Sequence, residues 1–276
     1  MKNTIGVSTN SYHGFSLDEA IAGISAAGYK YVELTSIKGW TEHIAAGMSD
    51  LEKDEAKRKI GDFGLQPFGL SGHCNIMEIE GLKDFEANIE LAAEFGCKYI
   101  LTATGKMRSN ENEASRDAAL IDNLNSLMPK CEQYGMELVL EILDEHDTGE
   151  KLRQIVSKVS SDNIGIAYDT ANVVLYGRVM PEDDIKTCAD YVKYVHLKDK
   201  TGAMDEWRFP AVGSGTLKLL EIMDYLAGNG YGGPYCVEIE YTEEFTMRNK
   251  VAGDIDIANK GVADSFNYLK VNGRII

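Results

Sequence analysis

The stretch 163–172 reads N-I-G-I-A-Y-D-T-A-N and decides how the rest of this chain of 276 residues can fold. It opens on a turn-forming Asn, continues as a short apolar run, and ends on Asp169 followed by small polar residues. Such a run is typical of a strand buried on both faces, as the strands of parallel sheets are. An acid at the carboxyl end of a parallel strand lies where such sheets place their chemistry.

Three further apolar runs also end in an acid or a histidine. They read E-L-V-L-E, ending at Glu141, Y-V-K-Y-V-H, ending at His196, and P-Y-C-V-E, ending at Glu238. Neighbouring strands lie roughly 4.8 Å apart, so side chains at matching strand ends can meet. We therefore expect one cluster at the carboxyl ends of the strands, made of Glu141, Asp169, His196 and Glu238.

Strand-like and helix-like segments alternate along the whole chain. Strands are predicted at residues 4–10, 31–35, 65–70, 98–103, 137–141, 164–169, 192–196 and 235–238. Helices are predicted at residues 17–27, 50–63, 84–95, 113–134, 150–159, 183–189, 216–227 and 255–271. Alternating pairs of this length, with no Pro-, Gly- or Ser-rich linker, predict a single (β/α)8 TIM barrel over residues 1–276. A doubly wound sheet is the competing architecture, but no G-x-G-x-x-G follows the first strand.

The composition limits the partners of the chain. It holds 28 Lys and Arg against 44 Asp and Glu, a formal net charge of -16. A field of this sign repels phosphate backbones, so we expect no binding to nucleic acid or to anionic membranes. The five cysteines form no C-x-x-C pair, which argues against a disulfide framework. Without a signal-peptide core or an apolar stretch of about 20 residues, a cytoplasmic protein is expected, and homo-oligomerisation is left open.

The four expected side chains form a donor set that suits a divalent metal ion. Three carboxylates and one imidazole are mainly hard donors, which favour Mn²⁺, Mg²⁺ or Co²⁺ in six-coordinate geometry over a closed structural Zn²⁺ site. Two coordination positions would then remain for substrate oxygens. A single acid at a strand end is as often a helix cap or the partner of a lysine. Four such residues at matching strand ends favour the metal site.

The order E…D-T-A-N…H-L-K-D…E, from Glu141 to Glu238, resembles the xylose-isomerase-like TIM-barrel superfamily. The resemblance covers essentially the whole chain, and the motif is specific to the superfamily rather than to one activity within it. That group includes ketose 3-epimerases, hydroxypyruvate isomerase, inosose dehydratase and the metal-dependent endonuclease IV. The resemblance implies that the four side chains hold one ion, often Mn²⁺. It also implies that Glu141 and Glu238 transfer protons on either side of the substrate.

Two positions depart from the sugar epimerases of this superfamily. A histidine three residues after the metal aspartate is replaced by Asn172, and an arginine six residues after the metal histidine by Gly202, with Arg208 the nearest arginine. We expect Asn172 and Arg208 to contact the substrate. Asp147 stands where the epimerases have an acid that contacts the substrate. The endonuclease branch needs further histidines after the seventh strand, and none follows His196. A nuclease is therefore disfavoured.

Other loop residues on the same side of the barrel are candidates for binding a substrate. His73 follows the third strand and could hydrogen-bond a sugar hydroxyl, and the face of Trp40 suits the C–H surface of a sugar ring. Lys198 could contact the substrate or form a local pair with Asp199. The histidine and the tryptophan also have structural readings, as an exposed or capped side chain and as a buried loop anchor. Segment 211–215, A-V-G-S-G, resembles a phosphate loop, although a lone G-x-G is a weak signal.

We expect an enzyme that isomerises or epimerises a small sugar or keto-polyol through an enediolate, with Glu141 and Glu238 as acid and base. The same enolate could expel a β-hydroxyl. A dehydratase or lyase acting on a keto-inositol, a dehydroshikimate-like acid or a 3-keto-glycoside is therefore the alternative. A sugar-binding or scaffold protein without turnover is an alternative of another class. The sequence leaves the sugar, its phosphorylation state and the native metal open.

Overall fold

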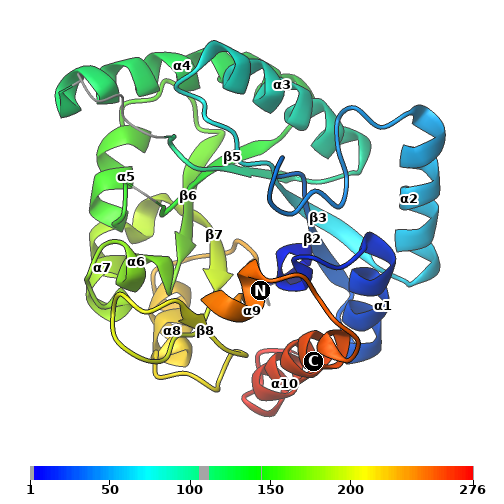
Figure 1. Cartoon of the computed structure of the whole chain (residues 1–276). Helices are drawn as coiled ribbons and strands as arrows, with labels where there is room; N and C mark the ends of the chain where they lie inside the picture. Colours follow the sequence, from blue (N-terminus) through cyan, green and yellow to red (C-terminus); the bar gives the residue numbers. More distant parts are fainter. Residues whose placement is uncertain (1–2, 106–111, 144, 276) are drawn as a thin grey trace.

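A closed barrel of parallel strands forms the centre of this chain, whose computed structural model describes residues 3–105, 112–143 and 145–275. A ring of helices surrounds the strands (Figure 1). The strands follow one another around the barrel as β1 (Ile5–Ser8), β2 (Tyr31–Thr35), β3 (Gln66–Ser71), β4 (Tyr99–Thr102), β5 (Glu137–Glu141), β6 (Ile164–Asp169), β7 (Val192–Leu197) and β9 (Tyr235–Val237). The predicted TIM barrel is confirmed.

The long helices each follow a barrel strand, as the alternating pattern predicts. They are α1 (Leu17–Ala27), α2 (Asp50–Asp62), α3 (Ile79–Glu94), α4 (Glu113–Tyr134), α5 (Gly149–Val156), α7 (Pro181–Cys188), α8 (Leu219–Gly228) and α10 (Asp254–Val271). Shorter turns are η1 (Thr9–Tyr12), α6 (Asn172–Leu175), η2 (Ala189–Tyr191) and α9 (Glu243–Met247). None of the helices in the described ranges is long and apolar enough to cross a membrane.

Local capping explains why several helix ends match the prediction. The Ser16 hydroxyl accepts the N–H of Glu19, and the Glu19 carboxylate accepts the N–H of Ser16, which is a capping box at the start of α1. Gly28 ends the helix with a φ of 103°, in the left-handed region where only glycine is unstrained. Caps of this kind are written in the local sequence, so these ends could be predicted.

Several predicted boundaries were wrong, and hydrogen bonds to side chains explain two of them. The first strand ends at Ser8 instead of residue 10, because the Ser8 hydroxyl accepts the N–H of Asn10 at 3.2 Å and turns the chain into η1. Helix α8 starts at Leu219 instead of residue 216, because the carboxylate of Asp199 accepts the N–H of Leu217 at 3.2 Å and holds the preceding loop. Helix α3 also starts five residues earlier than predicted, at Ile79.

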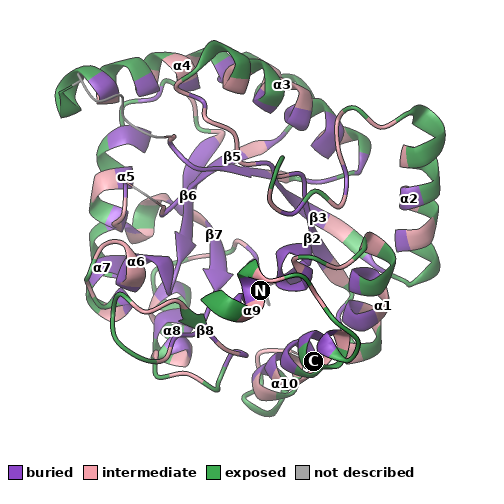
Figure 2. Cartoon of the chain, in the orientation of Figure 1, coloured by how far each residue is buried: buried purple, intermediate pink, exposed green. Residues whose placement is uncertain are grey.

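The barrel strands are almost entirely buried, whereas the outer faces of the helices are exposed (Figure 2). Every residue of β6 is buried. Inside the barrel an apolar layer forms a floor, which consists of Phe68, Leu101, Val139, Ala167, Tyr194 and Cys236. Several of these residues lie two positions before a predicted site residue on the same strand, as Ala167 does before Asp169. Because side chains alternate along a strand, those site residues point to the same interior, one layer above the floor.

A second, small sheet joins two loops at the mouth, meaning the end of the barrel where the strands have their carboxyl ends. Strand β8 (Arg208–Phe209), in the loop after β7, pairs antiparallel with β10 (Tyr241–Thr242), in the loop after β9. Tyr241 has a φ of 56°, which is uncommon for a residue with a side chain. The sequence analysis did not predict this sheet.

Candidate metal centre

The structure brings the four predicted ligands together at the mouth. One donor atom from each side chain lies within 4.8 Å of the donors of the other three. These residues are buried, and at most 5% of the surface of each residue is exposed. The cluster consists of Glu141, Asp169, His196 and Glu238.

The strand ends determine this convergence. Glu141 and Asp169 are the last residues of β5 and β6, His196 is the penultimate residue of β7, and Glu238 directly follows β9. In the sheet register Asp169 lies opposite His196. All four therefore reach the same level of the barrel. The sequence pattern had predicted His196 and Glu238 as the last residues of their strands, and each lies one position away from that end.

The Asp169 carboxylate provides the clearest test of whether a cation fits here. Its Oδ1 accepts the N–H groups of Ala171 and Asn172 at 2.8 and 2.7 Å. Its Oδ2 is buried without a hydrogen-bond partner, which is costly for a carboxylate oxygen. Burial raises the pKa of Asp169 to about 7. A divalent ion would satisfy this oxygen, so the hard donor set and its geometry fit the ion.

The imidazole of His196 is oriented by a residue that the sequence analysis missed. Its Nε2 lies 2.9 Å from a carboxylate oxygen of Glu33, which also accepts the hydroxyl of Tyr194 at 2.6 Å. Its Nδ1 faces Glu141 at 2.9 Å. A carboxylate behind a histidine fixes the tautomer of a metal ligand, here leaving Nδ1 for the ion. The only signal in the sequence was one acid inside the apolar strand Y-V-E-L-T.

The two glutamates of the cluster are held in their ionised form. Burial alone would raise the pKa of Glu141, but His196 and His73 hold it well below its ordinary value. The pKa of Glu238 is likewise raised by burial and lowered more by Lys198 and His196. Both carboxylates are therefore available as ligands and as proton acceptors at neutral pH.

Lys198 lies beside the cluster and is buried in an ionic network. Its ammonium is 3.0 Å from Glu238 and 3.3 Å from the side-chain oxygen of Asn172, and it contacts the carboxylate of Glu240 directly. The same ammonium lies 4.5 Å from the centre of the Phe209 ring. Burial raises the pKa of Glu240, and the ammonium of Lys198 opposes that rise. The sequence analysis singled out Lys198 but not Glu240, which lies beyond the strand end.

A cavity of about 340 Å³ opens above the cluster. Four of the predicted substrate-binding residues line it, namely Trp40, His73, Asn172 and Lys198. The remaining lining residues are Asn10, Ile37, Ser71, Glu141, Leu143, Tyr176, Trp207, Glu238, Glu240 and Met247. The indole N–H of Trp40 donates to Asn10 at 3.0 Å, and Asn10 in turn donates to Glu238 at 3.0 Å. Asn10 was also missed, because the prediction placed it in a strand.

The other two predicted substrate contacts lie outside this cavity. Asp147 pairs with Lys151 at 2.9 Å, one helical turn later in the chain. Arg208 belongs to β8, where its side chain is 54% exposed and pairs with Glu206 at 2.5 Å. Asp147 and Arg208 were selected by their spacing from the metal ligands in the sequence. That spacing does not determine where a loop side chain points.

The loop that resembles a phosphate-binding loop already holds an anion from its own chain. One carboxylate oxygen of Asp199 accepts the N–H groups of Gly213 and Gly215, both at 2.9 Å. The other oxygen accepts the N–H groups of Lys200 at 2.9 Å and Leu217 at 3.2 Å. Asp199 is buried. The glycines therefore serve to wrap backbone around this carboxylate.

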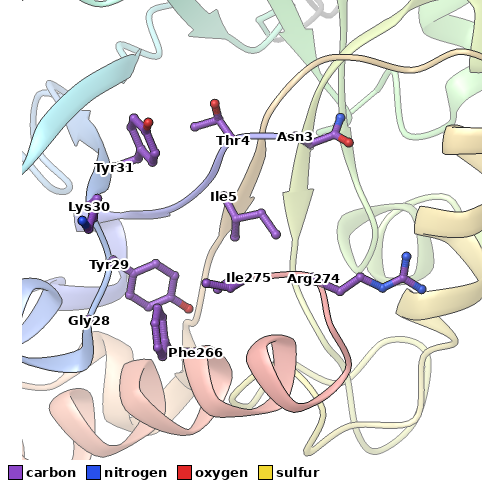
Figure 3. A pocket seen from close by; sticks show the side chains of 10 residues that line it. All are labelled: Asn3, Thr4, Ile5, Gly28, Tyr29, Lys30, Tyr31, Phe266, Arg274 and Ile275. Atoms are coloured by element: carbon purple, nitrogen blue, oxygen red, sulfur yellow. The ribbon is translucent and has the colours of Figure 1, made fainter. Parts of the chain in front are cut away.

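A second cavity, of about 300 Å³, lies at the opposite end of the barrel, beside the amino ends of β1 and β2 (Figure 3). It is lined by Asn3, Thr4, Ile5, Gly28, Tyr29, Lys30, Tyr31, Phe266, Arg274 and Ile275. None of these lining residues is an acid, a histidine or a cysteine. The cluster of three carboxylates and one imidazole lies instead at the mouth, where TIM barrels carry their active sites.

The fold and the cluster together define a TIM barrel with a candidate metal centre at its mouth. The model of the xylose isomerase-like TIM barrel family matches residues 21–270, and the chain belongs to this family.

Individual relatives are distant. The inosose dehydratase of Geobacillus kaustophilus is 27% identical over 135 residues, which cover 44% of this chain and 44% of the dehydratase. A xylose isomerase-like TIM barrel protein from Mycobacterium smegmatis, solved in complex with magnesium, superposes with a TM-score of 0.76 at 18% identity, covering 98% of this chain and 97% of that one. A D-psicose 3-epimerase superposes with a TM-score of 0.75 at 17% identity, covering 98% and 99%. These structural likenesses show the shared fold.

Proposed function

We propose that this chain is a divalent-metal-dependent enzyme that isomerises or epimerises a small sugar or keto-polyol. The observation that carries the proposal is the buried cluster of three carboxylates and one imidazole, whose donors lie within 4.8 Å of one another. The D-psicose 3-epimerase on the same fold and the partial match to inosose dehydratase support sugar chemistry. The magnesium complex of the M. smegmatis protein supports a divalent ion. We propose Mn²⁺ as that ion, with Mg²⁺ or Co²⁺ as alternatives.

The ion would be held by Glu141, Asp169, His196 and Glu238. When bound, it would polarise a substrate carbonyl and so acidify the neighbouring C–H group. The unpartnered oxygen of Asp169 is free to bind the ion, and the Nδ1 of His196 faces the same cluster, 2.9 Å from Glu141. These two residues would act as ligands only.

Glu141 and Glu238 would move the proton. They approach the cluster from β5 and β9, on either side of Asp169 and His196. One carboxylate would remove the proton next to the carbonyl, and the other would return it to the opposite face, which gives the epimer. Asn10 and Lys198 hold Glu238 at 3.0 Å each, and such positioned acid–base groups contribute roughly 10²–10⁴ in rate.

The lyase alternative is favoured by the match to inosose dehydratase. If the hydroxyl group β to the carbonyl leaves after proton removal, the same two glutamates give an unsaturated product instead of an epimer. An enone or diketone absorbs in the ultraviolet, so product spectra separate the two reactions.

Deuterium uptake tests the proposal. The Mn²⁺-loaded protein is incubated in D₂O with a panel of neutral ketoses and keto-inositols, and we expect label at one carbon next to the carbonyl. Glu141→Gln and Glu238→Gln each keep an oxygen ligand but lose the proton carrier, so each should slow exchange roughly 10²–10⁴-fold. Asp147→Asn, which removes a carboxylate outside the cavity, is the matched control. Full exchange rates in both glutamine variants would contradict the roles given to the glutamates.

A further inference from the structure

The ionic network beside the metal centre bears on which sugars can enter. Among the described residues that line the cavity, Lys198 is the one lysine or arginine. A lone, free ammonium at this place would attract a phosphate or carboxylate group. Lys198 is not free, because it contacts Glu240 directly and lies 3.0 Å from Glu238. Glu240 is held in turn by the side-chain N–H of Asn10 at 3.2 Å.

We propose that Glu240 neutralises Lys198 and thereby restricts this cavity to uncharged substrates, so that phosphorylated and carboxylated sugars are excluded. The inference rests on the proposed function, since it concerns which sugars reach the same site. It makes the dehydroshikimate-like acid the least suitable of the lyase substrates.

The charges around the cavity support this exclusion. With a divalent ion bound and His196 neutral, the positive groups are the ion, Lys198 and, when protonated, His73, which lies 2.8 Å from Glu141. They stand against five carboxylates, those of Glu33, Glu141, Asp169, Glu238 and Glu240. The site therefore keeps a net negative charge even when His73 is protonated. An anionic group brought next to buried carboxylates is repelled, because like charges repel more strongly where burial lowers the effective dielectric constant.

Beyond Lys198, the described part of the cavity wall carries no lysine or arginine that could pair with an anion. The described wall away from the cluster is formed mainly by apolar and aromatic side chains, namely Ile37, Trp40, Leu143, Trp207 and Met247. The nearby Lys200 donates to the backbone oxygens of Ala203 at 2.7 Å and Glu206 at 2.6 Å. The G-x-G loop at residues 213–215 has its N–H groups occupied by Asp199. Aromatic faces of this kind suit the C–H surface of a neutral sugar.

Glu240→Gln tests the inference, because it removes one negative charge while keeping the side chain's shape. Calorimetry on the Mn²⁺-loaded protein would compare neutral ketoses with their phosphate esters. We expect the wild type to bind the esters roughly 10- to 100-fold more weakly, since one like charge at close range is worth at least that factor. Glu240→Gln should remove most of this difference. Asp205→Asn, which removes the same charge from an exposed pair with Arg178, should leave it unchanged.

Inorganic phosphate serves as a probe that needs no knowledge of the sugar. It should raise the thermal midpoint of the Glu240→Gln protein and leave that of the wild type unchanged. If no ketose binds or exchanges deuterium, the proposed function fails, while the phosphate response still decides the role of Glu240. The inference is overturned if the wild type binds esters as tightly as neutral ketoses, or if phosphate stabilises both proteins equally. Should Glu240→Gln not fold, the wild-type comparison decides, and Glu240→Asp, which keeps the charge, should preserve the exclusion.

Discussion

Glu33 is a buried residue that supports the candidate metal centre without being one of the four predicted ligands. It is fully buried in the middle of β2, where it accepts from Tyr194 and faces the Nε2 of His196. A charge at this depth is costly unless it is hydrogen-bonded, and both partners of Glu33 belong to β7. Glu33 on β2 therefore fixes the orientation of the His196 imidazole, which belongs to β7.

Glu33→Gln should therefore weaken the binding of the metal. An amide oxygen accepts the N–H of His196 less strongly than a carboxylate, and loss of such a partner typically lowers metal affinity roughly 10- to 100-fold. Titration calorimetry with Mn²⁺ measures the affinity, and the nitrogen chemical shifts of the imidazole report its tautomer. Unfolding of the metal-free protein is the control for a general loss of structure. Unchanged Mn²⁺ affinity in a folded variant would remove the role assigned to Glu33.

Single residues were predictable where the strand pattern fixes both their position and their direction. Apolar runs that end in Glu141 or Asp169 place those side chains at the mouth, because alternation along a strand leaves little choice. Glu33 lies within a strand and Glu240 beyond one, so the pattern of strand ends did not select them. Arg208 was selected by its distance along the chain, which says nothing about the path of a loop.

At the level of the elements, the contact between α1 and α10 requires a residue without a side chain at Gly23. Figure 1 shows these two helices side by side, where the chain closes the ring. A Cβ atom on Gly23 would lie 2.1 Å from the side-chain oxygen of Asn259 and 2.2 Å from the hydroxyl of Tyr12. Those two groups are hydrogen-bonded to each other at 3.0 Å. The absence of a side chain at residue 23 lets helix, turn and helix pack together.

Gly23→Ala should lower the free energy of unfolding, against the usual preference of helices for alanine. Overpacking of this kind costs typically 1–3 kcal/mol, about as much as the gain in helix propensity or more. Gly61→Ala in α2 is the matched variant, since nothing lies within 4 Å of a Cβ atom there. It should stabilise the protein by up to about 1 kcal/mol. Denaturant unfolding compares the two, and equal stabilisation by both would disprove the packing argument.

Some helix and strand boundaries are set by local caps, and others by contacts with residues distant in the sequence. The ends of α1 and α4 were predicted because Ser16, Gly28 and Gly135 cap them locally. The start of α8 was missed, because Asp199, about 20 residues earlier in the chain, organises the preceding loop. The end of β1 was missed because a serine within the strand-like run proved to be a cap. The contact of Asp199 with the loop comes from the tertiary fold and is invisible to a pattern, whereas the cap at Ser8 is local and was read as part of the strand.

For the whole molecule, the candidate metal centre links four strands of one barrel wall, β5, β6, β7 and β9. An ion that binds only the folded chain stabilises it by about 2.7 kcal/mol at a hundred times its dissociation constant. Adding Mn²⁺ to chelator-treated protein should therefore raise the thermal midpoint, and renewed chelation should reverse the shift. A variant with both Asp169→Ala and His196→Ala should not respond. A wild type that is indifferent to both metal and chelator would rule out the centre.

The pairing of β8 with β10 has a consequence for protein engineering. The loop after β7 carries Lys198, and the loop after β9 carries Glu240. Because backbone hydrogen bonds between Arg208–Phe209 and Tyr241–Thr242 join these loops, neither can be shortened or exchanged without disturbing the other. A chimera that takes only one of these loops from a relative would leave β8 or β10 without its pairing strand. Transplanting a new sugar preference into this barrel would require moving both loops as a single cassette.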